Sequence, residues 1–166
     1  MVRDLFNQDL VKSEWLHPTE FPSMKGKKVI AIDLETCDTE LKKMGPGWPR
    51  KIGSVIGIAM SSGEFTAYYP IAHEGGGNMD KDKVLKYIKS ICEDESIQKV
   101  FHNAQYDIGW LSTLDIEVKG YIHDTMIASA LLNENRYSYT LNQMCIDYLG
   151  EYKDEKVLKA KAEELG

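Results

Sequence analysis

Two acidic side chains, Asp33 and Glu35, stand two residues apart directly after the apolar run Val29–Ile32. On an extended strand, side chains at positions i and i+2 point to the same face, so the two carboxylates would lie a few ångströms apart. No Lys or Arg lies between them, and such a pair is costly unless a cation binds. Carboxylate oxygens are the ligands that Mg²⁺ and Mn²⁺ prefer. The spacing therefore indicates a metal site, although a solvated acidic strand end has the same pattern.

A third acid, Asp107, comes 74 residues after Asp33 and just beyond a second apolar segment, Val100-Phe101. It lies four residues after Asn103, so both side chains can face the same side of the first turns of a helix. An amide and an acid at the start of a helix can also be simple caps. The order of the two patterns, a strand ending in DxE and then a strand and helix carrying NxxYD, is more specific than either alone.

The segments that must position these residues can be read from the hydrophobic periodicity. Residues 1–26 form a polar lead-in, and residues 37–52, rich in Gly and Pro, form a loop. Ser62-Gly63 predicts a hairpin turn between two strands. The chain therefore predicts strands at 29–32, 54–61, 64–71 and 99–101, and helices from 79 to about 92, from about 106 to 114, and at 125–132, 139–149 and 153–165.

Two further features have a plain structural interpretation beside a functional one. Tyr106 and Trp110, four residues apart, could stack on an unpaired base. At helical spacing beside Leu111 and Leu114, core packing is the better interpretation. The glycine run 75–77 could cradle a phosphate, but it lacks the following GK[ST] or the GxGxxG frame of known phosphate loops.

Three short motifs together resemble a known superfamily. Asp33–Thr36 (DLET) resembles the first motif of the DEDD exonucleases, and His102–Asp107 (HNAQYD) resembles the second. His123–Met126 (HDTM) resembles the segment that opens the next helix in family A DNA-polymerase proofreading domains and in RNase D. The similarity covers residues 27–150. The sequence between the motifs is most similar to that of bacteriophage-type family A polymerases.

The resemblance implies an α/β fold, an RNase H-like mixed sheet flanked by helices. It implies 3′-5′ exonuclease activity on a single-stranded or frayed DNA 3′ end, with two divalent ions (Mg²⁺ or Mn²⁺) about 4 Å apart. Asp33, Glu35 and Asp107 match metal ligands, and Thr36 and Asn103 match residues near the terminal nucleotide. A polymerase domain is expected in the same full-length chain.

The superfamily also has a fourth carboxylate, in a YxxxD or HxxxD motif on a later helix, and no such motif follows Asp124 in this sequence. Asp124 itself matches a position more consistent with a structural role. We expect the fourth acid beyond Gly166, so that residues 27–166 form an exonuclease domain without its C-terminal part and residues 1–26 form an N-terminal arm. The chain alone is then predicted to be weakly active or inactive.

The formal net charge of −6 and the sequence pI near 5.3 argue against a protein whose main task is tight, nonspecific binding to duplex DNA. No apolar run is long enough to span a membrane, and no signal peptide precedes the domain, so we expect a cytoplasmic protein of the cell or phage host. Two alternatives stay open: an RNase D-like exoribonuclease, and a noncatalytic nucleic-acid-binding module with the same fold.

Overall fold

The computed structural model describes residues 17–74 and 76–151. They fall into two compact units, divided between His123 and Asp124, which are treated separately below. In chain order the elements are β1 (Val29–Cys37), α1 (Leu41–Met44), the 3₁₀ helix η1 (Trp48–Arg50), β2 (Ser54–Ser61), β3 (Thr66–Pro70), α2 (Lys81–Cys92), β4 (Gln98–Phe101), α3 (Ala104–Ser112), β5 (Ile122–Asp124), α4 (Thr125–Leu132) and α5 (Leu141–Leu149).

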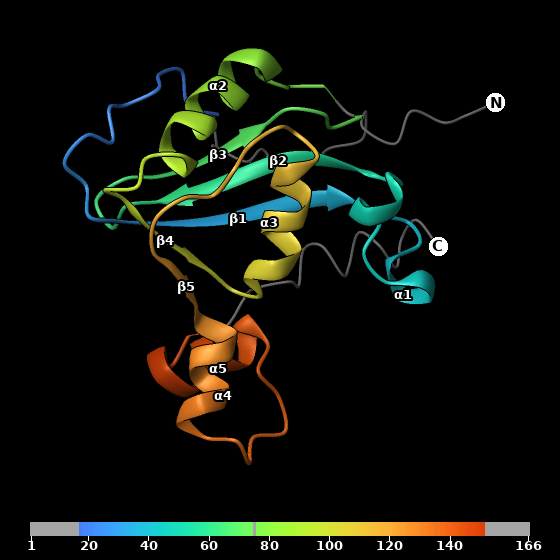
Figure 1. The fold of residues 1–166 in the computed structure, drawn as a ribbon, viewed down its shortest axis with the longest axis vertical. Coiled ribbons are helices and arrows are strands. Elements are labelled where there is room, and N and C mark those ends of the chain that lie inside the picture. The colour runs from blue at the N-terminus through green and yellow to red at the C-terminus, as the bar shows by residue number, and fades with distance from the viewer. Residues whose placement is uncertain (1–16, 75, 152–166) are drawn as a thin grey trace, which may run out of the picture. The chain divides into compact units, whose positions relative to one another are not determined.

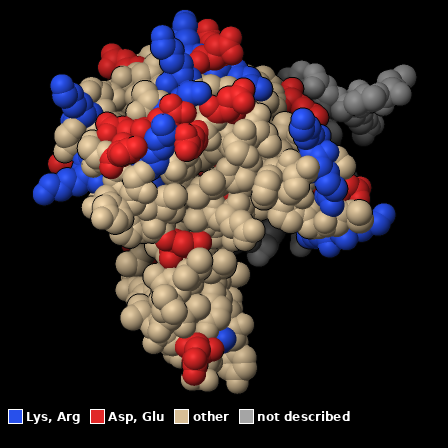
Figure 2. All heavy atoms as spheres, in the orientation of Figure 1, with Lys and Arg blue, Asp and Glu red and all other residues tan. Residues whose placement is uncertain are grey.

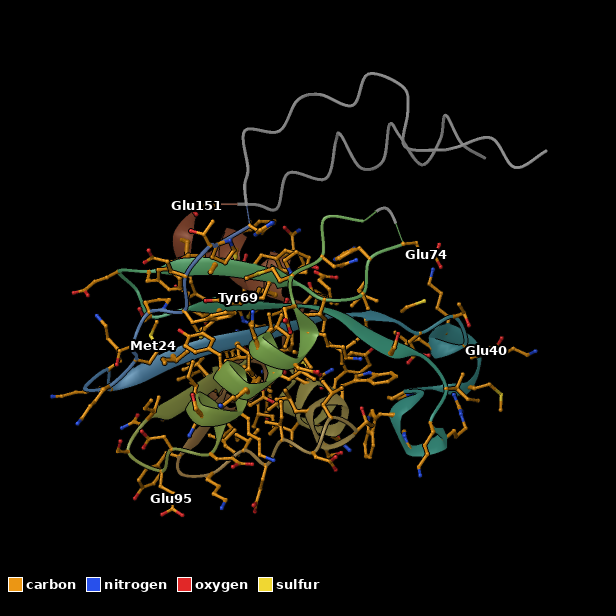
Figure 3. The ribbon with its side chains drawn as sticks, turned by 90° about the horizontal axis from the view of Figure 1, so that it is seen from above. Met24, Glu40, Tyr69, Glu74, Glu95 and Glu151 are labelled. Atoms are coloured by element: carbon orange, nitrogen blue, oxygen red, sulfur yellow. The ribbon has the colours of Figure 1, made fainter. Side chains whose placement is uncertain are left out.

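The strands form one mixed sheet in the order β3-β2-β1-β4-β5. The central strand β1 runs antiparallel to β2 and parallel to β4, as the prediction of a mixed sheet requires. Its residues alternate strictly, with Ile30, Ile32 and Leu34 buried on one face and the intervening residues exposed on the other. Helices α2 and α3 lie together on the buried face (Figures 1 and 3). The hydrophobic core of this unit therefore lies between the sheet and these two helices.

Both helices present the apolar faces that their periodicity predicts. Asp80 caps α2 by accepting a hydrogen bond from the Lys83 amide, and Val84, Ile88, Ile91 and Cys92 are buried. On α3, Trp110 is only 1% exposed and belongs to the core cluster with Leu111. The core-packing interpretation of Trp110 is confirmed.

One core position is a lysine. Lys99 lies on the buried face of β4, and its ammonium group donates to the carbonyl oxygens of Asp94 (2.5 Å) and Lys119 (2.7 Å). Burial lowers the pKa of this amine. The two carbonyl oxygens replace the water molecules that the ammonium group loses on burial. The same two hydrogen bonds tie the segments that precede β4 and β5 to strand β4.

The described part of the N-terminal arm is anchored on the core. Phe21 stacks on Tyr69 with ring centroids 5.8 Å apart and contacts Tyr87 at 5.0 Å. The Tyr87 hydroxyl donates to the Pro22 carbonyl at 2.8 Å. Two further apolar residues of this arm, Trp15 and Leu16, lie outside the described residues.

The structure differs from the sequence-based expectation at several points. The segment 37–52 contains the short helices α1 and η1, which are too brief to leave a hydrophobic period. Strand β1 continues through the acidic residues to Cys37, and β5, three residues long, was not predicted. The helix expected at 153–165 lies outside the described residues.

The second unit, from Asp124 onward, contains α4 and α5. The Thr140 hydroxyl caps α5, and the Ser129 hydroxyl donates to the Met144 sulfur at 2.7 Å between the two helices. Arg136 pairs with Asp147 at 2.6 Å. In the part of the chain that the structure describes, no helix is long and apolar enough to cross a membrane.

Candidate active site

Asp33 and Glu35 lie on the same exposed face of β1. In the antiparallel register with β2, Asp33 is opposite Ala59 and Glu35 is opposite Gly57. Both neighbours on β2 are small, and the space over Gly57 is taken by the Tyr68 ring. The register then shifts between Glu35 and Thr36, a β-bulge of the kind that redirects side chains near active sites.

Asp107 reaches the same strand from α3. β1 pairs with β4 only as far as Ala31, so its edge continues beyond that partner. There the Leu34 amide, which lies between the two exposed acids in sequence, donates to Oδ1 of Asp107 at 3.2 Å. Asp107 is 3% exposed, so its carboxylate is held firmly against the strand. The three acids are thus attached to one short stretch of backbone.

The capping interpretation does not account for the second motif. Asp107 binds the backbone of β1, a contact that a helix cap would not make. Asn103 does occupy the N-cap position of α3, but its side chain makes no capping hydrogen bond. Its backbone is left-handed (φ 69°, ψ 56°), a conformation that Asn tolerates better than most residues. The side chain of Asn103 is therefore not needed to begin the helix.

A second link joins the two motifs. The Thr36 hydroxyl and the Tyr106 hydroxyl are 2.7 Å apart and share a hydrogen bond. Tyr106 in turn meets Trp110 edge to face, with ring centroids 6.4 Å apart. Strand β1 and helix α3 are therefore fastened on both sides of Glu35, by Asp107 at Leu34 and by Tyr106 at Thr36.

Tyr68 and His73 are neighbours of the site that the sequence did not single out. Tyr68 is paired with Ala59, which places it on the face that carries Asp33, and its ring lies where a side chain on Gly57 would be. Its hydroxyl is 2.5 Å from Nε2 of His73. Burial, and then the nearby charge of Glu35, raise the pKa of the Tyr68 hydroxyl. The alternation of side chains along β3 could have placed Tyr68 on this face, but only if the register between β2 and β3 had been known.

Asp124 has a structural role, as its motif position suggested. Its carboxylate caps α4 by accepting from the amides of Met126 (2.9 Å) and Ile127 (3.3 Å). The preceding His123 lies 2.8 Å from the amide oxygen of Gln98.

Among residues 17–74 and 76–151, no three His, Cys, Asp or Glu side chains converge closely enough to hold a metal ion. The donor chemistry nevertheless suits Mg²⁺ or Mn²⁺, since Asp33 and Glu35 present two carboxylates on one face and Asp107 adds a third at the adjoining edge.

Solved structures share this fold. Escherichia coli RNase D matches with a TM-score of 0.57 and 23% identity, covering 77% of this chain and 29% of that chain. Brucella melitensis NrnC with bound Mg²⁺ matches with a TM-score of 0.60 and 20% identity, covering 81% of this chain and 61% of that chain. The expected RNase H-like fold, with a mixed sheet and flanking helices, is confirmed.

The sequence comparisons identify the family. The model described as "3'-5' exonuclease" matches residues 20–164. The DNA-directed DNA polymerase of Pseudomonas phage M6 is 36% identical over 162 residues, 94% of this chain and 24% of that protein. DNA polymerase I of Pseudomonas aeruginosa is 31% identical over 129 residues, 75% of this chain and 14% of that protein. The chain spans about a quarter or less of these relatives, and it belongs to the 3′-5′ exonuclease family found in phage and bacterial DNA polymerases.

Proposed function

We propose that the chain serves as the proofreading part of a DNA polymerase and hydrolyses nucleotides from DNA 3′ ends with two divalent metal ions. The observation that carries this proposal is the attachment of three acids to β1: Asp33 and Glu35 share one face, and Asp107 binds the backbone amide between them. Three carboxylates attached to three consecutive residues of one strand are a costly arrangement unless they bind cations.

Asp33, Glu35 and Asp107 are the residues that would hold the metal ions. The ions would supply charge stabilisation and activate water at a phosphodiester bond. The chain's own residues would position the substrate. Thr36, whose hydroxyl shares a hydrogen bond with Tyr106, and Asn103, which precedes Asp107 by four residues, are proposed to contact the terminal nucleotide. The Mg²⁺ in the NrnC structure supports the choice of ion, as that protein shares the fold.

The relatives support a longer protein in which this domain is joined to a polymerase domain. Because the matched proteins are DNA polymerases, we place this exonuclease in one chain with a polymerase domain, acting on a frayed or single-stranded DNA 3′ end in the cytoplasm of the cell or phage host. The fourth carboxylate of the superfamily would complete the metal site. Without it the 166-residue chain is expected to hydrolyse DNA weakly or not at all.

Metal titration tests the site without relying on activity. Mn²⁺ binding to the chain, followed by calorimetry, should weaken at least about tenfold in Asp33→Asn, because a charged oxygen ligand is lost. Asp82→Asn is the matched control, since Asp82 is an exposed acid on α2, away from β1. Equal affinity in Asp33→Asn and wild type would refute the proposal. Rapid metal-dependent DNA hydrolysis by the chain, abolished in Asp33→Asn, would refute the need for a fourth acid.

One observation favours a second candidate, a noncatalytic module that grips nucleic acid. The described residues bring no three metal-binding side chains together, as a finished catalytic centre does. This candidate predicts binding of single-stranded DNA that is unaffected by Mn²⁺ and by Asp33→Asn. Metal-dependent binding of a DNA 3′ end would exclude it. An RNase D-like preference would appear in the same assay as tighter binding of RNA than of DNA.

A further inference from the structure

A cavity of about 650 Å³ lies beside the C-terminal end of α3. Asp107 of the candidate site belongs to the opposite, N-terminal half of this helix. Its walls are the segment 48–55, which contains η1, the last turn of α3 with the residues that follow it, and Lys81 at the start of α2. All of these belong to the first unit of the chain. The volume is within the range of sites that bind small molecules or parts of larger ligands.

The cavity carries positive charge. Lys51 and Lys81 line it, against one carboxylate, that of Asp115. The residues Trp48 and Trp110 also line it, but the indole N–H of Trp48 is buried against Gly109 and is not open to a ligand. Two ammonium groups beside one carboxylate favour an anionic ligand.

The loop that carries Lys51 is well ordered by its own contacts. The Gly47 amide donates to Asp38 at 2.7 Å, and the Ile52 amide donates to the Gly47 carbonyl at 3.1 Å. Lys51 itself is left-handed (φ 57°, ψ 37°), a conformation that is strained for a residue with a side chain. Such strain is often found at binding sites. A lysine is thus held by a fixed loop in a conformation that glycine would adopt more easily.

The surface around this loop is basic, although the whole chain has a net charge of −6. Lys42, Lys43, Arg50 and Lys51 are all exposed within ten residues of sequence. Figure 2 shows Lys and Arg side chains over α1 and the segment after it, at the right of the view. A basic surface that continues beyond a cavity suits an extended polyanion better than a single small anion.

Helix α3 connects this cavity with the candidate site. Asp107 lies in its first turns, whereas Ser112 and Thr113 at its end line the cavity. At about 1.5 Å per residue, Thr113 is roughly 9 Å along the helix from Asp107. That distance corresponds to roughly three nucleotides of a stacked strand at about 3.4 Å each.

We propose that the cavity and the basic loop around it bind the phosphodiester backbone of a single DNA strand, a few nucleotides before its 3′ end. Lys51 and Lys81 contact phosphates, and the half-buried ring of Trp48 offers an aromatic edge beside them. The inference rests on the proposed exonuclease function, because that function supplies the strand. It adds a contact region that is separate from the three acids.

The test is binding of a fluorescein-labelled twelve-residue oligothymidylate to the 166-residue chain in EDTA, followed by anisotropy at several salt concentrations. In the double variant Lys51→Gln/Lys81→Gln, affinity at low salt should fall at least about tenfold. The slope of log K against log salt should become shallower by roughly 1.4, about 0.7 for each lost phosphate contact on a single strand. The matched control is Lys25→Gln/Lys86→Gln, since both lysines are exposed and lie outside the cavity. Circular dichroism checks that each variant is folded.

Intrinsic fluorescence gives an independent result. Oligothymidylate should quench tryptophan emission in the wild-type chain, and Trp48→Phe should remove most of that quenching. Unchanged affinity and salt slope in the Lys51/Lys81 variant, or an equal loss in the control, would overturn the inference, as would the absence of binding to the wild-type chain at low salt. Mn²⁺ titration of the same variant separates the two proposals. Retained Mn²⁺ binding with lost DNA binding supports both, whereas a wild-type chain that binds DNA but not Mn²⁺ refutes only the metal site.

Discussion

Replacing Asp107 separates its structural contact from its proposed role as a metal ligand. Oδ1 accepts the Leu34 amide at 3.2 Å in a position that is 3% exposed. Asp107→Asn keeps a carbonyl oxygen at nearly the same place and removes the charge. Asp107→Ala removes both the charge and the acceptor. The two variants therefore differ mainly in whether the edge of β1 keeps its hydrogen-bond partner.

In EDTA, the variants should differ in the free energy of unfolding. Asp107→Ala leaves a buried amide without its acceptor and is expected to lose about 1–3 kcal/mol from that effect, in addition to lost packing. Asp107→Asn should be close to wild type or slightly more stable, because a charge no longer has to be held in a buried position.

Mn²⁺ should reverse the order of wild type and Asp107→Asn. A ligand present at 100 times its Kd stabilises the folded state by about 2.7 kcal/mol. The wild-type chain should gain this amount, and Asp107→Asn much less, because it lacks one anionic ligand.

The assay is urea unfolding followed by circular dichroism, with and without Mn²⁺. Equal losses for Asn and Ala in EDTA would refute the role of the Leu34 hydrogen bond. Equal stabilisation of wild type and Asp107→Asn by Mn²⁺ would refute metal ligation by Asp107 while leaving the structural contact intact.

Three further predictions concern the surroundings of the site and the core. Gly57→Ala places a methyl group where the Tyr68 ring lies and should lower the free energy of unfolding by about 1–3 kcal/mol. In a Tyr68→Ala background, which removes the ring, the loss should be smaller. Thr36→Val should cost about 0.5–1.5 kcal/mol through the lost Tyr106 hydrogen bond, and a double-mutant cycle with Tyr106→Phe that shows no coupling would contradict this. Burial raises the pKa of the Cys92 thiol from 9.0 to about 12, so the unfolded chain loses this proton first. Its contribution to stability should be intact below about pH 9 and fall between pH 9 and 12, and Cys92→Ala should flatten that part of the urea-unfolding pH profile.

Local patterns predicted much of this fold. The apolar run at 29–32 located strand β1, and the period of 3.6 in α2 located its buried face, because each depends only on neighbours in sequence. The hairpin between β2 and β3 followed from Ser62-Gly63 for the same reason. The short helices α1 and η1 had no such signal, since three or four residues do not complete a recognisable period.

The candidate site could be predicted as a set of residues but not as a set of contacts. Asp33 and Glu35 share a face by strand geometry alone. The contact of Asp107 with Leu34 depends on where β4 stops pairing with β1, which is a long-range property of the sheet. Tyr68 reaches the neighbourhood of Glu35 only through the registers of two strand pairs. Tertiary contacts of this kind leave no local pattern in one sequence.

The end of the β1–β4 pairing explains why Asp107 contacts β1 between the two other acids. A strand that outruns its neighbour exposes backbone groups that need partners. Here helix α3 covers that edge, and the residue that satisfies the Leu34 amide is an aspartate. The contact that completes the edge of the sheet therefore also fixes the Asp107 carboxylate against the strand that carries Asp33 and Glu35. If Asp107 is a metal ligand, as proposed, this backbone hydrogen bond would leave it little freedom to lose on binding, so the contact that stabilises the fold would also pre-organise the site.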